Sequence, residues 1–428
     1  MKQQVAIITL GCSKNLVDSE KIAAQLNPNT FKVRYCTFPQ ATDVLIINTC
    51  GFILDAKKES IETILQAIEL KKKKQITQLF VAGCLSTRYL NELAQELPEV
   101  DRFFTVSDLM LIPRILNKKD YNYTYPIRYL STPKHYAYLK ISEGCNRKCS
   151  FCAIPQIRGK YRSDTIENLY VEALQLAEIG VKELILVAQD LTYFGVDRTR
   201  KPLLAQLIRK LSTIETIQWI RLHYTYPQFF TYDLIDEIAS NDKVCKYIDI
   251  PIQHISDKIL LKMKRRPLKK GIIDLLTKLR TRIPSLHLRT TVLVGHPSET
   301  KKDFDELIDF IKNFEFEKLG AFAYSHEENT YAAKHYKDTV SQKLKQERLS
   351  LVMEIQQKIS KKKNEQMIGT VQKVVIDSEE ADFYIGRTQF DSPEVDNEVL
   401  IRKLSQYRTG EFFNIKITDA FEFDLVGE

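Results

Sequence analysis

Residues 144 to 152 read GCNRKCSFC and follow an apolar run, residues 136 to 141, of the kind that forms β-strands. The cysteines of this stretch, Cys145, Cys149 and Cys152, are spaced C-x-x-x-C-x-x-C. A structural zinc site normally has four ligands, usually from two C-x-x-C pairs, and the chain has no second pair. Three thiolates can instead hold three corners of a four-iron cluster and leave one iron open. The stretch therefore indicates an iron–sulfur site, with the ring of Phe151 near the open iron.

A second set of three cysteines is dispersed, but Cys12, Cys50 and Cys84 each follow a strand-like run, at residues 5–10, 43–48 and 79–82. Helical patterns come next, over residues 17–26, 56–70 and 87–97. This alternation predicts an open parallel sheet, whose ligands bind beyond the carboxyl ends of the strands. We expect the three thiols to meet at that edge. The alternative is three buried structural cysteines, which is also our interpretation of Cys36 and Cys245.

Residues 136 to 324 contain repeated strand and helix patterns. Strand-like runs lie at residues 136–141, 183–188, 219–224, 247–252, 286–294 and 319–324, and helical patterns at 165–179, 202–211, 232–239, 268–280 and 300–313. Repeated βα units predict a partial TIM-like barrel whose active face lies at the carboxyl ends of its strands. Gln189 follows the second run and Gln253 the fourth, so both are expected at that face.

The rest of the chain predicts a long helix and a small all-β barrel. The helix covers residues 340–366, and strand-like runs follow at residues 370–376, 383–388, 398–401 and 412–420. The predicted fold is therefore α/β with three domains. They are an open parallel-sheet domain over residues 1–130, a partial (β/α) barrel with its connecting helix over 131–366, and an all-β barrel over 367–428.

The net charge of +8 is unevenly distributed. Residues 367–428 contain 6 Lys and Arg against 13 Asp and Glu, a balance of −7, which leaves +15 on the remainder. A basic body with an acidic C-terminal module suggests contact with a polyanion on one part and with a basic partner on the other. The alternative is that most of these charges belong to solvated surface. No apolar stretch is long enough to span a bilayer, and the run over residues 5–10 is too short for the core of a signal peptide, so we expect a cytoplasmic protein. In that compartment, clustered cysteines are better interpreted as metal ligands or redox groups than as disulfides.

The compact cysteine motif resembles the signature of the radical S-adenosylmethionine enzymes, C-x-x-x-C-x-aromatic-C. The resemblance implies that Cys145, Cys149 and Cys152 bind a 4Fe-4S cluster, whose open iron holds S-adenosylmethionine. One electron then splits this cofactor and releases a radical that abstracts hydrogen, which a closed barrel mouth would shield from water. Candidates for holding the cofactor are Phe151, Gln189, Arg221, Gln253 and Arg289. The four polar ones have an alternative role as barrel-layer hydrogen bonds or surface ion pairs, and His254 is either a proton carrier or a satisfied polar residue.

Further motifs narrow the resemblance to the methylthiotransferases. They are residues 11–20 (GCSKNLVDSE), 48–52 (NTCGF), 83–85 (GCL), 149–155 (CSFCAIP), 158–163 (RGKYRS) and 295–300. In that family the dispersed cysteines, here Cys12, Cys50 and Cys84, carry a second 4Fe-4S cluster that handles sulfur. The final barrel is similar to a TRAM domain, so the resemblance covers nearly the whole chain.

Within this family, several segments look like the branch that modifies an aspartate of protein twelve of the small ribosomal subunit. They are residues 188–197, 221–224, 249–254, 386–387 and 392–396. The resemblance implies S-adenosylmethionine as both radical source and methyl donor, a low-potential electron donor such as a flavodoxin, and a monomer. One alternative is a tRNA adenosine methylthiotransferase, and another is an iron–sulfur electron carrier or redox sensor that binds RNA. Contacts to RNA phosphates require Lys and Arg, so the acidic barrel favours a protein partner.

Overall fold

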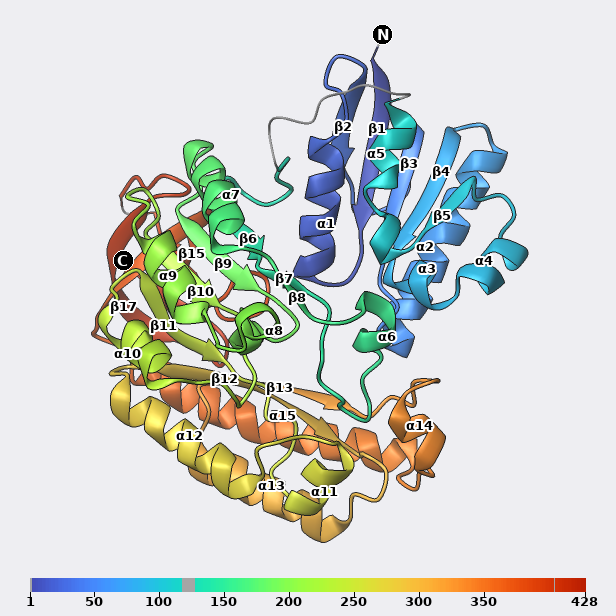
Figure 1. Cartoon of the computed structure of the whole chain (residues 1–428). Coiled ribbons are helices and arrows are strands. Elements are labelled where there is room, and N and C mark those ends of the chain that lie inside the picture. The colour runs from blue at the N-terminus through green and yellow to red at the C-terminus, as the bar shows by residue number, and fades with distance from the viewer. Residues whose placement is uncertain (1, 118–127, 404) are drawn as a thin grey trace. The chain divides into compact units, whose positions relative to one another are not determined.

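The computed structural model describes residues 2–117, 128–403 and 405–428, which form two compact units (Figure 1). Of the described residues, the first unit comprises 2–117, 128–132, 143–147 and 153–162, and the second comprises 133–142, 148–152, 163–403 and 405–428. The chain thus passes from one unit to the other within the compact cysteine motif. Among the described residues, no helix is long and apolar enough to cross a membrane.

The first unit is built on a five-stranded parallel sheet of order β2-β1-β3-β4-β5. Its strands are β1 (Gln3–Thr9), β2 (Phe31–Tyr35), β3 (Thr42–Thr49), β4 (Ile76–Gly83) and β5 (Arg102–Phe104). Its helices are α1 (Ser13–Ala24), α2 (Leu54–Lys72), α3 (Cys84–Arg88), α4 (Leu90–Glu96), η1 (Val106–Asp108), α5 (Leu111–Leu116) and α6 (Ile154–Arg158). The predicted open parallel sheet is confirmed.

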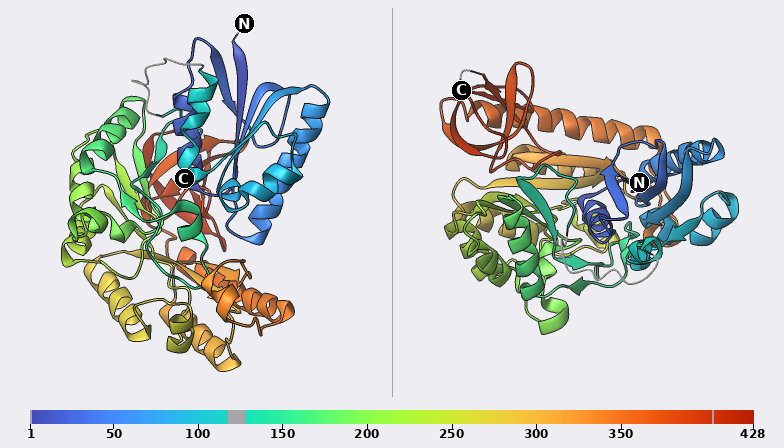
Figure 2. Two further views of the ribbon diagram at one scale, coloured as in Figure 1. Left: turned by 45° about the vertical axis from the view of Figure 1, so that its right-hand side comes forward. Right: turned by 90° about the horizontal axis from the view of Figure 1, so that it is seen from above.

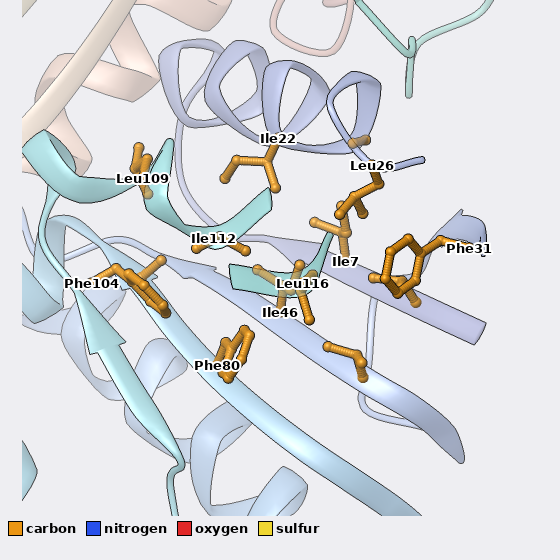
Figure 3. Close-up of a cluster of buried hydrophobic side chains, with 14 residues drawn as sticks. Ile7, Ile22, Leu26, Phe31, Ile46, Phe80, Phe104, Leu109, Ile112 and Leu116 are labelled. Carbon is orange, nitrogen blue, oxygen red and sulfur yellow. The ribbon is translucent and has the colours of Figure 1, made fainter. Parts of the chain in front are cut away.

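Helices cover both faces of this sheet. On one face, Ile22 of α1 and Ile112 of α5 pack on Ile7, Ile46 and Phe80 of the strands (Figure 3). On the other face, side chains of α2, α3 and α4 pack on the alternate strand residues. Strands buried on both faces lack polar alternation, which is why they appear in the sequence as continuous apolar runs.

One predicted helix of the first unit is wrong. The pattern over residues 87–97 suggests a single helix, but the structure has α3 and α4, separated at Tyr89, whose φ of −133° and ψ of 35° are not helical. The helical conformation also begins earlier than predicted, at Cys84 itself. Cys84 is thereby held between the end of β4 and the first turn of a helix.

The second unit contains a six-stranded parallel sheet of order β13-β12-β11-β10-β9-β6, as predicted for a partial barrel. Its strands are β6 (Tyr136–Lys140), β9 (Glu183–Val187), β10 (Trp219–Leu222), β11 (Val244–Asp249), β12 (His287–Val294) and β13 (Lys318–Ala323). Its helices up to residue 335 are α7 (Ile166–Glu178), η2 (Leu191–Tyr193), α8 (Val196–Thr199), α9 (Leu204–Ser212), α10 (Tyr232–Ser240), α11 (Asp257–Lys262), α12 (Lys269–Arg282), α13 (Lys301–Phe314) and α14 (Tyr331–His335). Two short strands, β7 (Ser142–Glu143) and β8 (Arg162–Ser163), pair with each other.

The long helix α15 (Gln342–Glu365) leads from this sheet to a closed barrel (Figure 2). The barrel has the order β14-β15-β16-β18-β17. Its strands are β14 (Val371–Glu379), β15 (Phe383–Thr388), β16 (Val399–Arg402), β17 (Phe412–Ala420) and β18 (Leu425–Gly427). The small all-β barrel is confirmed, with β18 as a strand that the sequence did not indicate.

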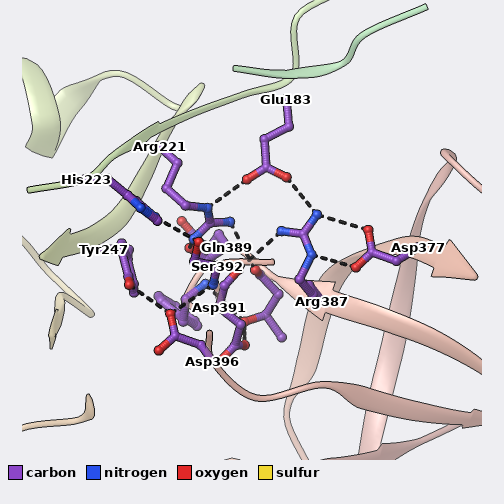
Figure 4. Close-up of polar contacts among 12 residues, drawn as sticks. Glu183, Arg221, His223, Tyr247, Asp377, Arg387, Gln389, Asp391, Ser392 and Asp396 are labelled. Carbon is purple, nitrogen blue, oxygen red and sulfur yellow. Dashed lines mark hydrogen bonds and ion pairs between the residues drawn. The ribbon is translucent and has the colours of Figure 1, made fainter. Parts of the chain in front are cut away.

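A buried ionic network joins this C-terminal barrel to the sheet of the second unit (Figure 4). Glu183 at the start of β9 accepts hydrogen bonds from Arg221 at 2.7 Å and from Arg387 at 2.9 Å, and Arg387 also bonds Asp377. Glu183 and Arg221 are completely buried. Burial alone would raise the pKa of Glu183, but the two guanidinium groups outweigh it and lower the pKa. The charges therefore compensate one another inside the protein.

Candidate functional site

The dispersed cysteines lie at one edge of the first unit's sheet. Strands β1, β3 and β4 are adjacent and parallel, with Asn48 paired to both Thr9 and Ala82. Cys12, Cys50 and Cys84 follow the carboxyl ends of these three strands. The backbone before Cys12 approaches Cys50 closely, because a Cβ atom on Gly11, whose φ is +93°, would lie 2.9 Å from the Cys50 Sγ. Only glycine is tolerated there without strain.

The three thiols influence one another electrostatically. Burial raises the pKa of Cys84 to about 12; Arg158 opposes this shift, and Cys12 and Cys50 add to it. Burial also raises the pKa of Cys50. The pKa of Cys12 is lowered, because the positive charges of Lys14 and Arg158 outweigh its burial. As thiolates, the three cysteines would repel one another, and buried cations lie beside them. Such a site is suited to a positively charged metal core.

This donor set consists of three thiols, the ligand type that holds iron–sulfur clusters. Among the described residues, no three His, Cys, Asp or Glu side chains are arranged to hold one metal ion. A cubane cluster makes no such demand, since each cysteine binds a different iron atom. Cys12, Cys50 and Cys84 are therefore the residues that would hold a cluster in this unit, with one iron left without a protein ligand.

The compact motif begins in the first unit, where Cys145 is fixed by a tight backbone crossing. The Cys145 N–H donates to the Gly159 carbonyl at 3.1 Å. A Cβ atom on Gly144, whose φ is +76°, would lie 2.2 Å from the Lys160 carbonyl oxygen. Cys145 therefore has a backbone position that depends on glycine at residue 144.

The motif continues in the second unit, where Ser150 is held by both of its backbone groups. Its N–H donates to the Met263 carbonyl at 2.9 Å, and its carbonyl accepts from the Ala332 N–H at 2.7 Å. Its hydroxyl lies 3.3 Å from Nε2 of His296, whose pKa burial lowers to about 4. These bonds fix the backbone between Cys149 and Phe151.

A buried arginine that the sequence did not single out contacts Cys149. Arg265 donates to the Cys149 Sγ at 3.5 Å and to the Pro251 carbonyl at 2.6 Å, and it stacks on Tyr226. Burial opposes its charge, but Cys149 and Tyr226 outweigh that effect and raise the pKa of Arg265. The bond to Pro251 places Cys149 beside the carboxyl end of β11, which is the face where the partial barrel is expected to be active.

Two of the predicted cofactor residues also lie at carboxyl strand ends. Gln189 follows β9, and both polar atoms of its side chain are buried without a hydrogen-bond partner in the described part of the chain. Gln253 follows β11 with a φ of +69°, and its backbone pairs with Thr291 and Leu293 of β12. Because buried amides are almost always satisfied, the Gln189 side chain is a position where a ligand would supply the missing partners.

The other predicted cofactor residues have protein partners. Phe151 packs in an apolar cluster with Met263, Leu293 and Tyr324. Arg221 donates to Glu183, to the Gln389 carbonyl at 2.7 Å and to the Thr388 carbonyl. These bonds to the C-terminal barrel occupy the guanidinium of Arg221, so we leave it out of the proposed cofactor site.

Arg289 and His254 are likewise bound to protein groups. Arg289 pairs with Asp249 at 3.3 Å and with Asp396 at 3.4 Å. His254 is buried, accepts from the Ser256 N–H at 3.0 Å and lies 3.6 Å from Glu299. Arg289 keeps about a fifth of its side chain exposed, so the ion pairs do not enclose it completely.

Models of known families match three parts of the chain. They are the radical SAM superfamily over residues 139–311, the uncharacterized protein family UPF0004 over 4–105 and the TRAM domain over 368–428. A solved structure of the radical S-adenosylmethionine methyltransferase TsrM from Kitasatospora setae has a similar fold, with a TM-score of 0.56 at 12% identity over 76% of this chain and 75% of that one. The fold and the cysteine loop are those of a radical S-adenosylmethionine enzyme with a TRAM domain.

Curated relatives define the family more closely. The ribosomal protein uS12 methylthiotransferase RimO of Parabacteroides distasonis is 48% identical over 100% of this chain and 99% of its own length. The protein of the same name from Bacteroides thetaiotaomicron is 49% identical over 99% of this chain and 98% of its length. The chain belongs to the RimO family of methylthiotransferases, which confirms the resemblance found in the sequence.

Proposed function

We propose that this chain attaches a methylthio group to the β-carbon of an aspartyl residue of ribosomal protein uS12. The proposed cofactors are two 4Fe-4S clusters, held by Cys12, Cys50 and Cys84 and by the three cysteines of residues 145–152, and S-adenosylmethionine. When bound, these groups supply a carbon-centred radical, sulfur and a methyl group. The observation that carries the proposal is the second cysteine set, gathered at its own sheet edge, since radical generation needs only the first.

The protein's own residues hold and enclose these groups. The bonds of Ser150 fix the loop of the radical site, and Arg265 places a positive charge beside the Cys149 sulfur. Gln189 offers an amide donor and an acceptor at the carboxyl end of β9. Phe151 of the same loop packs with apolar side chains of other segments, and this cluster would exclude water from one side of the site.

The partners follow from the same chemistry. The electron is supplied by a low-potential donor of the flavodoxin kind, and the enzyme works as a monomer in the cytoplasm, where its substrate is made.

The TRAM barrel docks on uS12 by charge. Asp377, Asp391 and Asp396 are buried or half-buried in ionic contacts with Arg387, Lys318 and Arg289. Leaving out these three acids and Arg387, the barrel still has 10 acidic against 5 basic residues, a balance of −5 that suits a basic protein.

Mass analysis of both candidate substrates tests the proposal. The reconstituted protein is incubated with S-adenosylmethionine, a reductant and either uS12 or unmodified tRNA. We expect a methylthio group on one aspartyl residue of uS12 and none on tRNA. Product on tRNA alone would contradict the proposed substrate, and an absence of reductive cleavage of S-adenosylmethionine would contradict the enzyme class.

Replacement of Gln189 tests the cofactor site. We expect Gln189→Leu to weaken S-adenosylmethionine binding roughly tenfold or more, as the loss of about 1.5–3 kcal/mol from hydrogen bonds to a charged ligand implies. Thermal stability should stay the same or rise, because the substitution removes a buried amide without partners. Equilibrium binding to the reconstituted protein measures the first effect. Wild-type affinity would show that the amide does not contact the cofactor.

Charge reversal in the turn between β14 and β15 tests the docking surface. Glu380 and Asp382 are exposed there, and we expect Glu380→Lys with Asp382→Lys to raise KM for uS12 about fivefold at low salt, with kcat unchanged. The effect should shrink as salt screens it. The control is Glu347→Lys with Glu354→Lys on the exposed face of α15, which changes the net charge equally. An equal KM in both variants would contradict docking through this turn.

A further inference from the structure

A buried arginine outside both cysteine sets has no role in the chemistry proposed above. Arg158 ends helix α6 and is only 6% exposed. It belongs to the same compact unit as Cys12, Cys50, Cys84 and Cys145. An arginine cannot lose its charge inside a protein, so its surroundings must compensate a permanent cation.

The guanidinium of Arg158 is bound on both sides. Its Nη1 donates to the Glu143 carboxylate at 2.9 and 3.0 Å and to Asp18 at 3.2 Å. Its Nη2 donates to the Asn15 Oδ1, and the same oxygen accepts from the Cys84 thiol at 3.7 Å. Arg158 thus connects the segment that carries Cys145 with helix α1 and with the thiol of Cys84.

The residues next to Arg158 contact the same two groups, the Cys145 backbone and the Cys84 side chain. Gly159, the next residue, accepts the hydrogen bond from the Cys145 N–H. Ala153 and Ile157 of α6 pack on Cys84 in one apolar cluster. The segment from residue 153 to 159 therefore touches a ligand of each proposed cluster, and Arg158 is its only charged residue.

The electrostatic balance of the site changes when a cluster is bound. The Arg158 cation lies one hydrogen-bond acceptor away from the auxiliary thiols, since the Asn15 Oδ1 accepts from both its Nη2 and the Cys84 thiol. A 4Fe-4S core with three thiolates has a net negative charge, which becomes larger on reduction. Net charge and nearby hydrogen bonds set the reduction potential of such clusters, so a fixed cation favours the reduced form.

We propose that Arg158 is a positioning residue that holds the Cys145 segment against the auxiliary site and raises the reduction potential of the cluster bound by Cys12, Cys50 and Cys84. The inference rests on the proposed function only in requiring a cluster at these three cysteines.

Redox titration of single-cluster proteins tests this role. The full chain with Cys145→Ala, Cys149→Ala and Cys152→Ala retains only the auxiliary cluster, and iron analysis establishes its presence independently of Arg158. In that background we expect Arg158→Gln to make reduction of the auxiliary cluster about tenfold less favourable, which lowers its midpoint potential by about 59 mV. Electron paramagnetic resonance measures the reduced cluster during the titration. Arg158→Lys should stay near the parent value because it keeps the charge.

Two controls separate this effect from general damage. Arg128→Gln removes another buried guanidinium of the same unit, paired with Glu20, and should leave the potential unchanged. In the reciprocal background with Cys12→Ala, Cys50→Ala and Cys84→Ala, Arg158→Gln should alter the potential of the remaining cluster much less.

Loss of auxiliary iron in Arg158→Gln with recovery in Arg158→Lys would also support the proposal. An unchanged potential, an equal shift in Arg128→Gln, or loss of iron in all three variants would overturn it. No iron in the parent background would refute the auxiliary cluster itself.

Discussion

A protein carrying Cys12→Ala, Cys50→Ala and Cys84→Ala is expected to cleave S-adenosylmethionine but to form no methylthiolated uS12. The radical site has its own ligands in residues 145–152, and the bonds that fix Ser150 and Cys149 come from the second unit. Reductive cleavage therefore needs none of the three replaced thiols. Attachment of sulfur needs them, because they are the only other cysteine set in the chain. Chromatography of 5′-deoxyadenosine and mass analysis of uS12 measure the two activities.

The chain offers matched controls for this triple variant. Cys36 and Cys245 belong to neither set, and burial raises the pKa of each thiol. Cys36→Ala with Cys245→Ala should retain both activities, while replacement of Cys145, Cys149 and Cys152 should abolish both. Wild-type methylthiolation by the Cys12, Cys50 and Cys84 variant would contradict the division of labour between the two sets.

Glu183→Ala is expected to lower the free energy of unfolding by about 3–5 kcal/mol. The substitution leaves two buried guanidinium groups, Arg221 and Arg387, without the carboxylate that lies between them (Figure 4). Denaturant unfolding of the apoprotein measures the loss. Glu411→Ala, which breaks the exposed pair with Lys182, is the control and should cost no more than about 1 kcal/mol. Equal losses in the two variants would contradict a structural role of the buried network.

The same network predicts a dependence on pH. The pKa of Glu183 is lower in the folded protein than the usual value, since two arginines outweigh its burial. Its contribution to stability is therefore fully present above the unfolded pKa of about 4.3 and is lost as the pH falls toward the folded pKa. The difference in stability between wild type and Glu183→Ala should shrink in acid. A difference that stayed constant or grew as the pH fell below 4 would contradict this assignment.

The sequence predicted the placement of the dispersed cysteines because the parallel direction of the strands constrains them strongly. Buried parallel strands leave continuous apolar runs, and residues directly after such strands must lie at one edge. That reasoning located Cys12, Cys50 and Cys84 without any knowledge of the strand order. It failed for β2, β5 and β18, which are short strands with weak patterns, and for the break at Tyr89 between α3 and α4.

The polar residues around the sites were harder to predict, because side-chain partners are distant in sequence. Arg221 was a candidate for the cofactor, yet its partners are Glu183 and backbone groups of the C-terminal barrel about 170 residues later. Arg158 stood out only as part of the motif over residues 158–163, and Arg265 did not stand out, since their partners Asp18 and Cys149 lie 140 and 116 residues away. A buried arginine next to a cysteine ligand gives no local signal in one sequence. The three-domain division of the chain remains a prediction.

Iron and sulfide analysis of three reconstituted proteins determines whether one chain holds two separate clusters. We expect about eight iron and eight sulfide per chain in the wild type. About half of each should remain when Cys12, Cys50 and Cys84 are replaced by alanine, and about half when Cys145, Cys149 and Cys152 are replaced. Complete loss of iron in either variant, or no loss at all, would contradict the presence of two independent clusters.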